Sequence, residues 1–107
     1  MSGSFGELGS LLKQAQQMQR DLDKVRAELR ERSVEGTAGG GVVKVQVTGD
    51  RQVTEVHIAP VVIADGDAKE VEELVLLALK DGLAKAKKLA EETMGRVTGG
   101  VNLPGLF

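Results

Sequence analysis

Apolar residues recur with a helical spacing at the start of the chain. They fall at alternating steps of three and four, on Leu8, Leu11, Ala15, Met18, Leu22, Val25 and Leu29. A strict seven-residue repeat of this kind is typical of a helix that packs against another helix. The spacing therefore predicts a helix over about residues 5–32 with a narrow apolar stripe. The alternative is a single amphipathic helix that lies on its own sheet.

The middle of the chain changes to an alternating pattern. The stretch VVKVQVT places Val43, Val45 and Val47 on one face of a strand, and SVEGTA before it reads as a shorter strand. The glycines at 39–41 separate the two, with freedom for a left-handed turn. Together with the stretch that ends before Pro60, they predict a three-stranded antiparallel meander over about residues 33–58.

The dipeptide Gly49-Asp50 predicts a two-residue hairpin turn between the second and third strands. That turn would set Lys44 opposite Glu55 and Val43 opposite Val56, an ion pair and an apolar pair across the strands. Val53 would then fall on the polar face, so a bulge is compatible with the pattern.

A second long helix is predicted over about residues 68–96, with Asp67 as its N-cap. The stretch LVLLAL within it is apolar on every side, which is more than one face of a sheet can cover. We therefore predict a homodimer whose interface includes Leu74, Val75, Leu76, Leu77 and Leu79. The apolar, uncharged segment 97–107 is expected to be disordered or docked in a groove.

The amino-acid composition is informative mainly because it excludes several classes of function. The 107 residues fit one domain, and no window is long and apolar enough for a membrane span. The chain has no cysteine, and its single histidine, His57, has no identifiable nucleophile beside it. We expect no enzymatic activity, no cofactor, no metal and no small-molecule substrate. The start of the chain lacks the pattern of a signal peptide, which favours a cytoplasmic protein.

Several stretches together resemble the YbaB/EbfC family of bacterial nucleoid-associated DNA-binding proteins. They are LLKQAQQMQ, GGGVVKVQVTGDRQVTEVHIAP, the helix through LVLLALKDGLAKAKKLAEETMGRVTGG, and the closing NLPGLF. The resemblance runs nearly from end to end, with the motifs in the family's order. It implies an α+β fold of order α-β-β-β-α, a homodimer in which the sheets join, and helices that project like the arms of tweezers.

The resemblance also implies a function. A member of this family binds duplex DNA with low sequence specificity, alters its conformation, and contributes to nucleoid organisation and gene regulation. The binding surface of the family lies on the helices, which points to Lys13, Arg20, Lys24, Lys80, Lys85, Lys87 and Lys88. The net charge of −2 leaves an alternative open, a dimeric protein-interaction module with only incidental DNA binding.

Overall fold

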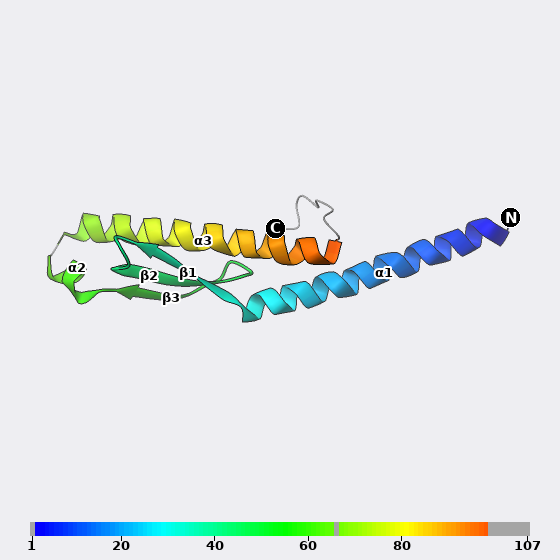
Figure 1. Cartoon of the computed structure of the whole chain (residues 1–107), viewed down its shortest axis with the longest axis horizontal. Coiled ribbons are helices and arrows are strands. Elements are labelled where there is room, and N and C mark those ends of the chain that lie inside the picture. The colour runs from blue at the N-terminus through cyan, green and yellow to red at the C-terminus, as the bar shows by residue number, and fades with distance from the viewer. Residues whose placement is uncertain (1, 66, 99–107) are drawn as a thin grey trace.

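The molecule is elongated, with one long helix over a three-stranded meander and a second long helix that projects away from it (Figure 1). The computed structural model describes residues 2–65 and 67–98. Its elements are α1 (Ser2–Glu31), β1 (Ser33–Ala38), β2 (Val43–Thr48), β3 (Val53–Ile58), α2 (Pro60–Ala64) and α3 (Ala68–Thr98). The molecule measures 77 × 20 × 17 Å, because α1 leads away from the sheet instead of folding over it. The predicted α-β-β-β-α order is confirmed.

The ends of the helices differ a little from the prediction. α1 begins at Ser2, and α3 continues to Thr98, so residues 97 and 98 are helical and not part of a tail. Asp67 caps α3 as expected, since its Oδ1 accepts hydrogen bonds from the backbone N–H groups of Lys69 and Glu70. The additional helix α2 starts at Pro60, whose ring holds φ at a helical value. Residues 99–107, the rest of the predicted tail, lie outside the described part.

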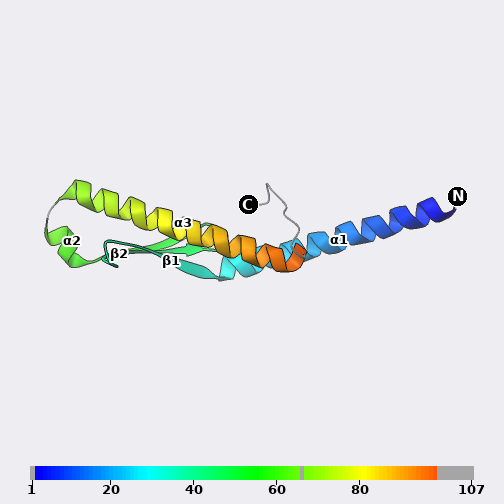
Figure 2. The same cartoon turned by 45° about the horizontal axis from the view of Figure 1, so that its top comes forward.

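The three strands form an antiparallel sheet in the order β1-β2-β3, and α3 runs along one of its faces (Figure 2). Val43, Val45 and Val47 are fully buried on this face, as the alternating pattern predicted. They pack with Ala78 and Ala86 of α3. α3 lies mainly over β1 and β2, so β3 is left exposed from Val53 to His57.

The contact between α3 and β1 depends on two glycines. A Cβ atom on Gly36 would overlap the backbone of Ala78 and Gly82, and its distance to the Cα atom of Gly82 would be only 2.6 Å. A Cβ atom on Gly82 would in turn lie 2.8 Å from a methyl group of Val47. Because neither residue has a side chain, the helix can approach the strand backbone directly.

The predicted register of the β2–β3 hairpin is wrong by two residues. The turn has three residues instead of two, because Arg51 adopts a left-handed conformation with φ of 66°. A bulge between Gln46 and Val47 shifts the register further, in agreement with the expected irregularity near Val53. As a result Lys44 faces His57, Val43 faces Ile58, and Glu55 lies opposite Gln46. The proposed pair of Lys44 and Glu55 does not form.

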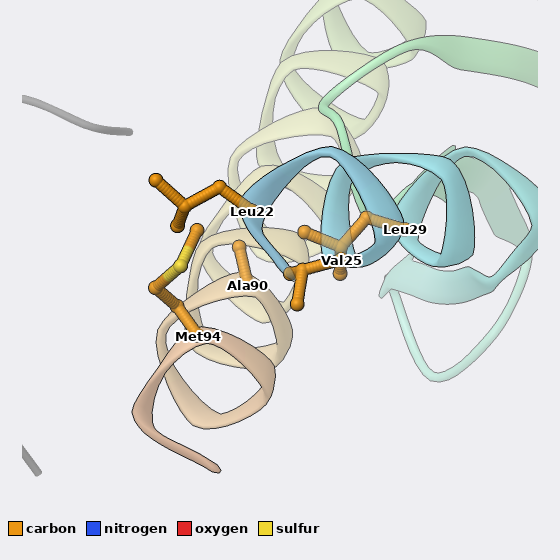
Figure 3. Close-up of a cluster of buried hydrophobic side chains, with 5 residues drawn as sticks. All are labelled: Leu22, Val25, Leu29, Ala90 and Met94. Atoms are coloured by element: carbon orange, nitrogen blue, oxygen red, sulfur yellow. The ribbon is translucent and has the colours of Figure 1, made fainter. Parts of the chain in front are cut away.

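The C-terminal third of α1 packs against the end of α3, and the two helices run in opposite directions. Leu22, Val25 and Leu29 of α1 are buried against Ala90 and Met94 of α3 (Figure 3). This confirms helix-on-helix packing for the second half of the apolar repeat. The first half lies beyond the end of α3, where Leu8, Leu11 and Met18 are exposed.

Candidate nucleic-acid interface

The outer face of α1 carries a line of cations. Lys13, Arg20 and Lys24 are spaced by seven and four residues, so they lie along one side of the helix. By helical periodicity this side is about half a turn away from Leu22, Val25 and Leu29, which face α3. All three cations are exposed. The line spans about 16 Å at 1.5 Å per residue.

This line begins in a part of α1 that has no acidic residue. Between Glu7 and Asp21 the only charged side chains are Lys13 and Arg20. The guanidinium of Arg20 donates a hydrogen bond of 3.3 Å to Oε1 of Gln17, which keeps it close to the helix surface. The projecting half of α1 is therefore positively charged, although the whole chain has a net charge of −2.

α3 presents its own cations away from the sheet. Lys80 and Lys87 are seven residues apart and share the outer face of the helix, and Lys88 lies about 100° further around. These three side chains are exposed and make no hydrogen bond or ion pair with another described residue. They are thus available to an anionic partner such as phosphate.

Lys85 differs from the other predicted cations, because it is engaged within the fold. Its Nζ lies 3.0 Å from Oδ2 of Asp81 and donates a 3.0 Å hydrogen bond to the carbonyl oxygen of Glu35. The same Asp81 oxygen accepts a 2.9 Å hydrogen bond from the backbone N–H of Thr37. This N–H and the hydrogen bond from Lys85 lower the pKa of the Asp81 carboxyl below its ordinary value. The pair closes the outer edge of β1.

Two further cations, Arg26 and Arg51, lie at the junction between α1 and the sheet. A hollow of about 390 Å³ there is lined by Arg26, Leu29, Gly49, Asp50, Arg51, Ala90 and Met94. Gly49 lies so close to α1 that its N–H donates 2.9 Å hydrogen bonds to the carbonyl oxygens of Leu29 and Arg32. Arg26 and Arg51 were not among the predicted DNA-binding residues, since only the fold brings the turn against α1.

The residues predicted for a dimer interface divide into two groups. Leu74, Val75 and Leu79 pack against the buried valines of the sheet. Leu76 and Leu77 remain 51% and 55% exposed. By helical periodicity Leu83 lies on the same side of α3 as Leu76, and β3 adds the exposed Val53 and Val56. A large apolar surface is thus left uncovered along α3 and β3.

The described residues contain no group of three or more His, Cys, Asp or Glu side chains placed to hold a metal ion. His57 lies exposed on β3, with Nε2 3.3 Å from Oε2 of Glu55. No helix in the described ranges is long and apolar enough to cross a membrane. Among the described residues, the exposed cations of α1 and α3 are the candidate binding groups.

Fold and charge define a small α+β protein with a basic side on the projecting half of α1 and exposed lysines on the outer side of α3. The chain belongs to the YbaB/EbfC DNA-binding family, whose sequence pattern matches residues 5–101. This confirms the family inferred from the sequence motifs.

Relatives match over almost the whole chain. A nucleoid-associated protein of Chloroflexus aurantiacus is 46% identical over 97 residues, which cover 91% of this chain and 95% of that protein. A nucleoid-associated protein of Alkaliphilus metalliredigens is 37% identical over 105 residues, or 98% of this chain and 92% of that protein. Nucleoid-associated protein TTE0040 of Caldanaerobacter subterraneus is 40% identical over 105 residues, again 98% of this chain and 94% of the relative.

The fold also has a counterpart among solved structures. The crystal structure of the uncharacterized protein HP0035 from Helicobacter pylori superposes with a TM-score of 0.59. The match covers 79% of this chain and 94% of that protein at 19% sequence identity. At this identity the similarity shows the fold alone.

Proposed function

We propose that this protein is a nucleoid-associated protein that binds duplex DNA through the outer faces of α1 and α3. The observation that carries the proposal is the line of Lys13, Arg20 and Lys24 on the projecting helix of a chain from a DNA-binding family. Lysine and arginine contacts to phosphate position a protein on DNA without reading its sequence. Binding therefore has low sequence specificity, and the bound duplex changes conformation to follow the helices.

The contribution of α3 comes from Lys80, Lys87 and Lys88. Lys85, although it was nominated with them, holds β1 to α3 through Asp81 and Glu35. A cation that is already paired contributes less to phosphate binding, because its existing contacts must be given up. We therefore assign Lys85 mainly to the stability of the fold.

The protein acts as a homodimer in which two sheets join. Asp81 and Lys85 occupy the outer edge of β1, which leaves the outer edge of β3 as the open side of the sheet. The exposed Leu76 and Leu83 of α3 lie toward this edge, together with Val53 and Val56, whereas the exposed Leu77 lies about 100° further around the helix. Pairing of β3 with its counterpart would bury both the open edge and the apolar surface, and would point the α1 helices away from the body.

The protein works in the cytoplasm on the bacterial nucleoid, where it contributes to DNA organisation and gene regulation, and it does so without catalysis. The names of the relatives from Chloroflexus, Alkaliphilus and Caldanaerobacter support this role. The competing function is a dimeric protein-interaction module that contacts DNA only incidentally. The net charge of −2 favours it, whereas the acid-free basic stretch of α1 favours DNA.

Salt dependence of binding separates the two functions. We expect the double variant Lys13→Gln, Arg20→Gln to bind unrelated duplexes more weakly and by a similar factor on each. Each lost phosphate contact should lower the slope of log affinity against log salt by about 0.9, so the two lost contacts should lower it by about 2 for each α1 helix of the dimer that touches the duplex. Fluorescence anisotropy with two duplexes of different sequence at several salt concentrations gives both quantities.

The matched control is the double variant Lys44→Gln, Lys69→Gln. It removes the same charge from the open face of the sheet and the start of α3. If control and test variants lose the same slope, binding follows net charge and the assignment to α1 is wrong. If the unmodified protein shows no steep salt dependence at all, the interaction-module function is the better one.

A further inference from the structure

The first half of α1 carries an apolar surface that no described residue covers. We define the α1 stripe as Leu8, Leu11, Ala15 and Met18, the part of the seven-residue repeat beyond the end of α3. Leu8 is 54% exposed, Leu11 is 61% exposed and Met18 is 44% exposed. The stripe continues the packed row of Leu22, Val25 and Leu29 without a break in period. The stripe therefore extends the α1 side of the α1–α3 interface beyond the end of α3, where no described residue packs against it.

The C-terminal end of α3 points toward this stripe. α1 and α3 run antiparallel, with Leu22 opposite Met94 near the last turn of α3 (Figure 3). α3 ends at Thr98, one helical turn after Met94, and Met18 lies one turn before Leu22 on the antiparallel α1, so the end of α3 is directed toward the stripe. The stripe extends from Met18 to Leu8 for about 15 Å at 1.5 Å per residue.

The following nine residues, 99–107, have the length and the chemistry to cover the stripe. Fully extended they span up to about 30 Å, twice the length of the stripe. They contain no charged residue and supply Val101, Leu103, Leu106 and Phe107. Gly99 and Gly100 provide backbone freedom for a change of direction directly after the helix.

We propose that residues 99–107 dock along the α1 stripe of the same chain and so complete the interface between α1 and α3. Four side chains over about 15 Å form a surface well below the roughly 800 Å² per partner of a standard interface between separate proteins. A segment tethered beside its site has an effective concentration in the millimolar range, so a small apolar contact is enough to hold it. Docking requires neither DNA nor a second chain. It shields the apolar side of the projecting helix while the basic side stays open.

A single tryptophan tests the docking, because the chain has neither tryptophan nor tyrosine. In the full chain with Leu103→Trp, we expect emission shifted to the blue and protected several-fold from acrylamide quenching. Adding Leu11→Asp, or separately Leu8→Asp, should move the emission to that of tryptophan in water. Both leucines lie outside the packed clusters, so circular dichroism should show the sheet and α3 unchanged.

The control is Gln16→Asp, which places the same charge on α1 away from the stripe and should leave the emission shifted to the blue. Emission typical of water in the Leu103→Trp chain itself, or an equal response to Gln16→Asp, overturns the proposal. Docking on a second chain is tested by mixing the Leu103→Trp, Leu11→Asp protein with an excess of the unmodified protein. Recovery of the blue shift in that mixture would mean that the segment crosses to its partner, and would overturn docking within one chain.

Discussion

At the scale of single residues, Asp81 does more for the fold than its position on an exposed helix suggests. Its carboxylate accepts the outward N–H of Thr37 and holds the Nζ of Lys85, which in turn reaches the carbonyl oxygen of Glu35. One pair of side chains, four residues apart on α3, thus satisfies both a donor and an acceptor on the edge of β1. Side chains that occupy the edge of a strand in this way hinder the addition of another strand.

The lowered pKa of Asp81 predicts a pH dependence of stability. A carboxyl whose pKa is lowered in the folded state contributes stability above its unfolded value of 3.8, and loses it as the pH falls through the folded pKa. We therefore expect Asp81→Asn to lower the melting temperature at neutral pH. The difference from the unmodified protein should shrink as the pH falls below 3.8. Thermal melts followed by circular dichroism at neutral and acidic pH would measure it.

The matched control is Glu73→Gln, which removes a charge from the same helix at an exposed position. A melting temperature that Asp81→Asn lowers equally at every pH would show that the Asp81 charge does not contribute through ionisation.

At the scale of elements, β3 is the strand whose outer side stays open. The N–H of Ala59 donates to the carbonyl oxygen of Val42, so by alternation the N–H of His57 also points toward β2. The N–H of Val56 points the other way, toward the open edge. Val56 is also 47% exposed on the apolar face. Its backbone and side chain are both available to the sheet of a second chain.

Proline at position 56 should block joining of the sheets while it spares the hairpin. In Val56→Pro the lost N–H is one that β2 does not use, so the folded chain should persist. We expect sedimentation equilibrium to show a much weaker dimer, and circular dichroism to show little change. Val56→Thr keeps the N–H and a branched side chain, and should dimerise nearly as well as the unmodified protein. Equal dimerisation of the two variants would mean that the sheets do not join through β3.

At the scale of the whole molecule, the described residues leave two apolar surfaces that no described helix or strand covers. α3 buries one side against β1 and β2, but Leu76 and Leu83 remain exposed toward the uncovered β3, and Leu77 is exposed on the outer face of the helix. The α1 stripe is a second such surface, at the other end of the molecule. We propose a different partner for each surface. A second chain covers the surface of α3 and β3, and residues 99–107 cover the α1 stripe.

A charged residue in place of Leu76 should weaken the dimer without unfolding the single chain. Leu76 is half-exposed in the single chain, so Leu76→Asp should leave the fold intact. An unpaired carboxylate at a buried interface costs about 3 kcal/mol or more, so the dimer should weaken about 100-fold or more. Analytical ultracentrifugation over a range of concentrations would measure this. Ala84→Asp, on the outer face of the same helix, is the control. If both variants remain fully dimeric, the interface lies elsewhere.

Much of the fold could be predicted because its signals are local. The repeat that leads to Leu29, the alternation through Val43, Val45 and Val47, and the cap at Asp67 each involve neighbours in sequence. Helical and extended backbones impose their periods on any chain, so patterns of this kind identify elements directly. For the candidate site, the cations could be placed on the helices, and the outward direction of Lys13 and Arg20 follows from the same periodicity.

What the sequence determined by itself is therefore the order of the elements, their inward faces and the family. The tertiary structure decided the hairpin register, the role of Lys85, and the close approach of Gly36 to Gly82. Each of these depends on a contact between segments far apart in the chain, or on a single backbone angle such as that of Arg51. Periodicity does not encode such contacts, because it describes which way a side chain points and not what lies opposite it.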